Sequence, residues 1–147
     1  MLSSQNYETY KKVDIETASQ GRLIVMLYEG AIRRVEEAIK QLGNNRLDAV
    51  NNNLVKGQEI VGELRSSLNM EAGEIAKNLD RVYEYMQHRM MMANIRKDKA
   101  MMEESVRLLT MLHDTWKKLF EGMPESDLRE ATSAAAQANP SVLNLQG

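Results

Sequence analysis

No proline interrupts the first 123 residues, and within this stretch apolar residues recur at alternating intervals of three and four. Both prolines, Pro124 and Pro140, lie in the last quarter of the 147-residue chain. Because proline is the strongest helix breaker, long helices are permitted everywhere before residue 124. The most regular repeat runs through Leu47, Val50, Leu54, Gly57, Val61, Leu64 and Leu68. This spacing is typical of a helix that buries one apolar stripe against neighbouring helices at a shallow angle.

Three further segments carry the same period. Residues 21–42 form a broad apolar stripe that includes Leu23, with Ser19 as the expected N-cap and Gly43-Asn44-Asn45 as the turn that ends the helix. Residues 73–97 form a third stripe, and a fourth follows Asp98 and stops at Gly122. Four helices of about 20–25 residues with short connections must run up and down beside one another. The sequence therefore predicts an all-α fold, an antiparallel up-and-down four-helix bundle with a short N-terminal cap segment.

The chain divides into three predicted units. Residues 1–18 form the N-terminal cap segment, in which a short amphipathic helix over residues 5–13 is expected to be separated from the first long helix by Asp14–Thr17. Residues 19–122 form the four-helix bundle. Residues 123–147 form a C-terminal tail, because no charged residue occurs from Ala131 to Gly147 and Ala, Ser, Gln and Asn dominate there.

The composition argues against several classes of function. The chain has no cysteine, so thiol catalysis and zinc fingers are excluded, and a net charge of -2 gives no basic surface for nucleic acid. No apolar run is long enough to insert into a membrane. The Glu-x-x-His pairs of di-iron bundles are missing, since Tyr85 and Thr110 stand three residues before His88 and His113. We therefore predict a cytoplasmic protein that is not an enzyme and has no metal or cofactor.

An apolar surplus remains once the core has been assigned. Met90, Met91 and Met92 are consecutive and span about 200° of a helix, so at least one of them should reach a surface other than the core. Unbranched methionine side chains suit surfaces that bind apolar peptides adaptably, although they also fill irregular cores. The residues alone thus predict a helical bundle whose apolar surplus binds another helix or an extended chain.

Several stretches resemble the flagellar secretion chaperone family (FliS). The first is TASQGRLIVMLYEGAI, residues 17–32, which is similar to the opening helix of the family. It is followed, in the family's order, by KGQEIVGEL at residues 56–64, by GEIAKNL at residues 73–79 leading to YEYM at residues 83–86, and by Ala93-Asn94. The resemblance implies a cytoplasmic bundle that binds the disordered C-terminal segment of flagellin. It also implies that the chain prevents premature polymerisation and helps to deliver flagellin to the flagellar export gate.

The resemblance also implies a set of client-binding residues, carried over by position. They are Tyr7, Tyr10, Ile24, Leu27, Tyr28, Ile32, Leu54, Ile60, Leu64, Leu79, Tyr83, Met86 and Met90. Which of them face the client and which face the core is left open by the sequence. Tyr10 and Tyr83 are the two that we expect at the surface.

Two alternatives and one anomaly stay open at this point. The same apolar stripe could serve a self-associating bundle, a homodimer with a structural or regulatory role, and a metal-dependent oxidase bundle is a third class. The anomaly is the tail AQANPSVLNL, residues 136–145, which resembles the extreme C-terminus of flagellin itself. The tail is interpreted as an engineered fusion, as a natural imitation of the client that occupies its groove, or as an extension with an accidental likeness.

Overall fold

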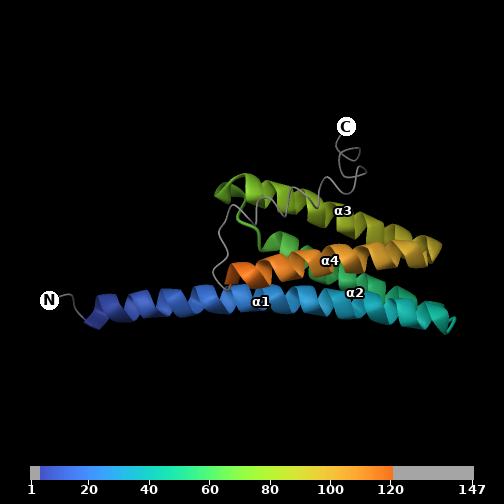
Figure 1. Cartoon of the computed structure of the whole chain (residues 1–147), viewed down its shortest axis with the longest axis horizontal. Coiled ribbons are helices and arrows are strands. Elements are labelled where there is room, and N and C mark those ends of the chain that lie inside the picture. The colour runs from blue at the N-terminus through green and yellow to red at the C-terminus, as the bar shows by residue number, and fades with distance from the viewer. Residues whose placement is uncertain (1–3, 121–147) are drawn as a thin grey trace.

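The computed structural model describes the backbone of residues 4–120 and the side chains of residues 21–71 and 73–119. Within this range there are four α-helices and no strand. Their bounds are α1 Ser4–Gly43, α2 Leu47–Ser66, α3 Glu74–Arg96 and α4 Lys99–Phe120, and a short 3-10 helix, η1, covers Met70–Ala72. α1 and α3 each pack on both α2 and α4 (Figure 1). The predicted all-α bundle is confirmed.

α1 differs from the sequence-based expectation because it is one continuous helix of 40 residues. The predicted separation at Asp14–Thr17 is wrong, and Ser19 lies inside the helix instead of capping it. The physical reason is that no glycine or proline occurs between residues 1 and 20, so nothing forces the chain to leave the helix. At 1.5 Å per residue α1 is about 60 Å long. The other three helices have 20, 23 and 22 residues, and α1 extends well beyond them at its N-terminal end (Figure 1).

The turns follow the local signals in the sequence. α1 ends at Gly43, and Asn45 adopts a left-handed backbone with φ 58°, a conformation that asparagine tolerates better than most residues. Between α3 and α4, Lys97 is left-handed, and the Asp98 carboxylate accepts a hydrogen bond of 3.2 Å from the Met101 backbone N–H. Asp98 is thus the predicted N-cap of α4. The stop predicted at Gly122 and Pro124 lies outside the described residues.

The core is built from the predicted stripes, with exceptions at their ends. In α2 the buried residues are Val50, Leu54, Gly57, Val61 and Leu64, whereas the two outer members of the predicted stripe are less covered. Leu47 is exposed because it is the first residue of α2, and Leu68 is half-buried because it lies two residues beyond the end of the helix, where fewer neighbours cover it. α4 contributes Met102, Ser105, Leu109 and Leu112 in full, and Trp116 packs against the core while partly exposed.

Gly57 lies where α2 approaches two neighbouring helices closely. A Cβ atom at this position would lie 2.7 Å from the terminal methyl of Met90 on α3, 3.6 Å from Val35 and 3.7 Å from Arg34 on α1. Three helices therefore meet around a residue without a side chain, and the Met90 methyl fills the space that a side chain would take. By contrast, a Cβ at Gly43 would have no neighbour within 4 Å.

A large side chain at Gly57 is therefore expected to force the helices apart. We predict that Gly57→Leu lowers the free energy of unfolding by about 2–3 kcal/mol, as overpacking of a core does. Chemical denaturation followed by circular dichroism measures this change. The matched control is Gly43→Leu, where the open surroundings predict a change within about 0.5 kcal/mol. Equal effects of the two substitutions would contradict the packing described here.

Candidate functional site

Most of the residues predicted to bind a client lie in the core of this structure. Seven of them are no more than 1% exposed, namely Tyr28, Leu54, Leu64, Leu79, Tyr83, Met86 and Met90. The expectation that Tyr83 lies at the surface is wrong, because its ring packs in the bundle centre and its hydroxyl is bonded there. Any contact of these seven side chains with a client would require the helices to separate. Their binding role stays a prediction.

Tyr28 of α1 and Tyr83 of α3 form a polar pair across the middle of the bundle. Their hydroxyl groups share a hydrogen bond, and their ring centroids lie 6.3 Å apart at an interplanar angle of 49°. Burial raises the pKa of Tyr83 to about 12, and burial together with the neighbouring Tyr83 raises the pKa of Tyr28 well above its usual value. The indole N–H of Trp116 is buried beside the pair, and its proximity acts to lower both pKa values. These aromatic residues join α1, α3 and α4.

Four predicted residues remain accessible. Ile24, Leu27, Ile32 and Ile60 are half-buried and pack against the core with one side only. The side chains of Tyr7 and Tyr10 lie outside those that the structure describes, so the predictions for them stand as made. The four accessible residues lie on α1 and α2.

An exposed apolar strip runs along the boundary of α1 and α2. Leu23 and Met26 are 55% and 58% exposed, and Leu27 and Gly30 follow them on the same face of α1. Gly30 adjoins α2, because a Cβ there would lie 3.6 Å from the Cδ1 atom of Ile60. We call Leu23, Met26, Leu27, Gly30 and Ile60 the α1–α2 strip. Such continuous apolar surface marks a site of interaction more often than isolated exposed residues do.

Sequence reasoning missed the two most exposed members of this strip. Leu23 was assigned to the core stripe, and Met26 to no site. The available signal was the width of the apolar arc, because residues 23 to 27 contain five apolar side chains in succession and span more of the helix than one core can cover. The prediction that at least one of Met90, Met91 and Met92 reaches a surface other than the core is confirmed, because Met91 is 41% exposed.

A second apolar area lies on α2 and α3 at the opposite end of the bundle. It consists of Leu47 and Val55 on α2 and Met91 and Ile95 on α3, and Ile95 is 69% exposed. We call these four residues the α2–α3 patch. A hydrogen bond of 2.8 Å between Asn51 and Asn94 joins the two helices in the middle of the patch, so its apolar side chains are not continuous in the way the α1–α2 strip is.

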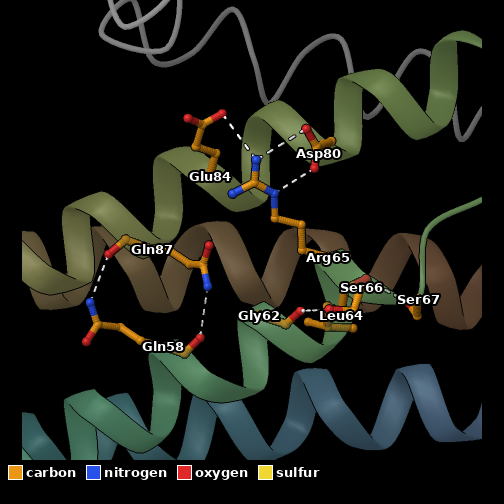
Figure 2. A network of polar contacts seen from close by, with 9 residues as sticks. All are labelled: Gln58, Gly62, Leu64, Arg65, Ser66, Ser67, Asp80, Glu84 and Gln87. Carbon is orange, nitrogen blue, oxygen red and sulfur yellow. Dashed lines mark hydrogen bonds and ion pairs between the residues drawn. The ribbon is translucent and has the colours of Figure 1, made fainter. Parts of the chain in front are cut away.

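Polar pairs set the register of α2 against α3. Asn51 pairs with Asn94, and seven residues further along α2 the Gln58 and Gln87 side-chain amides each donate to the other's backbone carbonyl, at 3.1 and 3.2 Å. Seven residues further again, Arg65 donates to Asp80 at 2.6 Å (Figure 2). At each step the partner residue on α3 lies seven residues earlier in the sequence, because the two helices are antiparallel. The pairs therefore form a polar ladder with the heptad period of an antiparallel coiled coil.

The described residues offer little for chemistry. Among the side chains that the structure describes, no three His, Asp or Glu groups gather so that they could hold a metal ion. A shallow hollow of about 350 Å³ lies between α1 and α4, and it is lined by Glu36, Ile39, Glu103, Val106 and Arg107. Over residues 4–120 no helix is long and apolar enough to cross a membrane. The accessible apolar surfaces are thus the features that call for a partner.

Comparison with known proteins assigns the fold to a family. The family model described as flagellar protein FliS matches residues 3–122, which is most of the chain. This chain belongs to the FliS family. The flagellar secretion chaperone FliS of Bacillus subtilis (strain 168) is 32% identical over 121 residues, which cover 82% of this chain and 90% of that protein. The protein of the same name from Salmonella typhimurium (strain LT2) is 31% identical over 137 residues, covering 89% and 99%.

Family membership confirms the resemblance found in the sequence. FliS proteins are flagellar secretion chaperones and not enzymes, which confirms the prediction that this chain is not an enzyme. A third relative, the flagellar secretion chaperone FliSB of Pseudomonas aeruginosa, is 32% identical over 121 residues, covering 79% of this chain and 96% of that protein. The match to the family ends at residue 122, close to the boundary predicted for the tail.

The pair Tyr28–Tyr83 is expected to stabilise the FliS fold as a unit. We predict that Tyr28→Phe or Tyr83→Phe alone lowers the free energy of unfolding by about 1–2 kcal/mol, because one buried hydroxyl loses its partner. The double substitution removes both hydroxyl groups, so its cost should fall below the sum of the single costs by about 1 kcal/mol. Urea denaturation of the four proteins measures this coupling. Strictly additive costs would contradict a hydrogen bond between the two hydroxyl groups.

The raised pKa values of the pair predict how stability depends on alkaline pH. A tyrosine in the unfolded chain ionises near pH 10, whereas Tyr83 in the folded chain ionises at about 12. The stability due to the buried phenol is therefore fully present below pH 10 and is lost as the pH rises from 10 to 12. We predict that Tyr28→Phe/Tyr83→Phe loses less stability over this interval than the parent, by more than about 2 kcal/mol, because Tyr83 alone accounts for about that much and Tyr28 adds to it. Denaturation at pH 9, 10.5 and 12 tests this, and parallel curves would refute it.

Proposed function

We propose that this FliS protein is a cytoplasmic chaperone that binds the disordered C-terminal segment of flagellin. By covering apolar client segments it prevents premature polymerisation and assists delivery to the flagellar export gate. The observation that carries the proposal is the α1–α2 strip, an accessible apolar surface on a protein that belongs to a chaperone family. The names of the relatives support the secretion role, since they are flagellar secretion chaperones.

The geometry of the strip suits an amphipathic client. Its members on α1 follow one another at intervals of three, one and three residues, so they form a narrow row along the helix, with Ile60 beside it on α2. A client helix that places its own apolar stripe on this row would bury side chains from both partners. A disordered segment loses entropy when it becomes ordered, so many modest contacts along a surface are expected instead of one deep pocket.

Charged side chains border the strip and favour one orientation of a helix that binds to it. On α1 the exposed neighbours Arg22, Arg33 and Arg34 are basic and Glu29 is acidic, so basic charge is in excess there. On α2 the exposed neighbours Glu59 and Glu63 are acidic and Lys56 is basic, so acidic charge is in excess there. Arg34 is held toward α2 by a hydrogen bond of 3.3 Å to Asn53. A client helix lying between the two rows would favour acidic residues on the α1 side and basic residues on the α2 side. Charges of this kind select the orientation of a partner more than they add affinity.

Substitution of the two most exposed strip residues tests the proposed site. We predict that Leu23→Ser/Met26→Ser weakens binding of a flagellin C-terminal peptide at least tenfold in isothermal titration calorimetry. Both side chains are more than half exposed, so the fold should be unaffected. The matched control is Met91→Ser/Ile95→Ser in the α2–α3 patch, for which we expect less than a twofold change. The site would be wrong if the control weakened binding as much as the strip variant.

Co-purification tests the function apart from the site. The parent chain should retain full-length flagellin and release flagellin that lacks its C-terminal segment. Retention of both, or of neither, would refute the proposed client.

The α2–α3 patch favours a second candidate function, self-association. Four exposed apolar side chains on an antiparallel helix pair could face the same four residues of a second copy. Light scattering separates the two candidates. A chaperone should form a defined complex with flagellin, whereas a self-associating bundle should be a dimer whose mass does not change when flagellin is added.

A further inference from the structure

The end of α4 brings the C-terminal segment of the chain close to the α1–α2 strip. α4 runs antiparallel to α1, since Glu36 and Ile39 of α1 face Glu103 and Val106 of α4 across the hollow, and Glu29 lies 3.9 Å from His113. Seven residues beyond His113, α4 has advanced by about 10 Å. Phe120 therefore lies level with Arg22 and Leu23, where the strip begins.

The chain that follows Phe120 is long enough to reach every part of the strip. It has 27 residues, and a fully extended segment of that length spans up to about 90 Å. The strip from Leu23 to Gly30 is only about 10 Å long, and the first ten residues after Phe120 suffice to cross the width of α1. The opposite end of the bundle, with the α2–α3 patch, lies about 30 Å from Phe120 along α4.

The composition of the segment fits an apolar surface with mixed charges at its borders. From Ala131 to Gly147 there is no charged residue, and the apolar side chains Val142, Leu143 and Leu145 occur together near its end. Burial of these side chains on Leu23 and Met26 removes apolar surface of both from water, and no charge has to be desolvated.

We propose that residues 131–147 of this chain bind to the α1–α2 strip in the same molecule and compete there with the client. The competition rests on the proposed function, whereas the docking does not. A tethered segment has an effective concentration of about 1 mM. Even a segment whose isolated dissociation constant is about 0.1 mM would then occupy the strip in about nine of ten molecules and weaken client binding about tenfold. A client must therefore bind the strip more tightly than the tail does in order to displace it, and the larger contact area of a client provides this affinity.

Cross-linking tests the docking without any client. Because the chain has no cysteine, two introduced cysteines give an unambiguous product. We expect Met26→Cys/Ser141→Cys to form an intramolecular disulfide under mild oxidation, and the control Ile95→Cys/Ser141→Cys to form at least fivefold less. Mass spectrometry distinguishes the monomer from a cross-linked dimer. Equal yields for the two pairs, no product, or a product that is only dimeric would overturn docking within one molecule.

Truncation tests the competition. Deletion of residues 129–147, which lie beyond the bundle helices, should tighten binding of the flagellin C-terminal peptide about tenfold in calorimetry. Val142→Ser/Leu143→Ser/Leu145→Ser in the full chain should have most of the same effect. An unchanged dissociation constant would overturn the competition, even where the disulfide forms. If neither protein binds the peptide, the proposed function fails, and the cross-linking result still decides whether the tail docks.

Discussion

The register between α2 and α3 determines which apolar side chains this bundle buries and which it leaves at the surface. Three polar pairs, from Asn51–Asn94 to Arg65–Asp80, repeat every seven residues along both helices. A slip of one residue would separate all three pairs at once and rotate the buried stripe of α2 away from the core. The apolar stripes alone would tolerate such a slip more easily, because leucine, valine and methionine are nearly interchangeable in packing. The polar ladder thus gives specificity to contacts that the apolar core makes strong.

The same register explains why α2 can lie close to both neighbours at Gly57. At Gly57 the helix faces α1 and α3 together, and a residue without a side chain occupies this position. Met90 enters from α3 to fill the space, and the tyrosine pair joins α1 to α3 across the bundle centre. Close packing at the centre buries the apolar side chains that lie there. Apolar residues that lie outside this geometry, Leu23 and Met26 among them, are left more than half exposed.

The sequence predicted the helices well and the fate of individual side chains less well. Periodicity located α2, α3 and α4 within a few residues, because intervals of three and four report which residues share a face. It failed at Asp14–Thr17, where a break between two helices is expected although none of these residues forbids a helix. It also placed Tyr83 at the surface and Leu23 in the core. Both errors have one cause: a stripe shows which residues share a face, but the number of neighbours facing that stripe is set by tertiary packing.

An apolar strip that remains exposed has a cost, and that cost explains the features around it. Leu23 and Met26 would favour aggregation if they met the same surface on another molecule, so a protein that keeps them for a client needs something to limit that encounter. An excess of basic residues on α1 and of acidic residues on α2 borders the strip, and charges of this kind reject partners that present the wrong pattern. An uncharged segment of the same chain avoids this rejection, because it carries no charge to be repelled. A covering supplied by the chain itself would protect the strip at low cost and yield to any client that makes a larger contact.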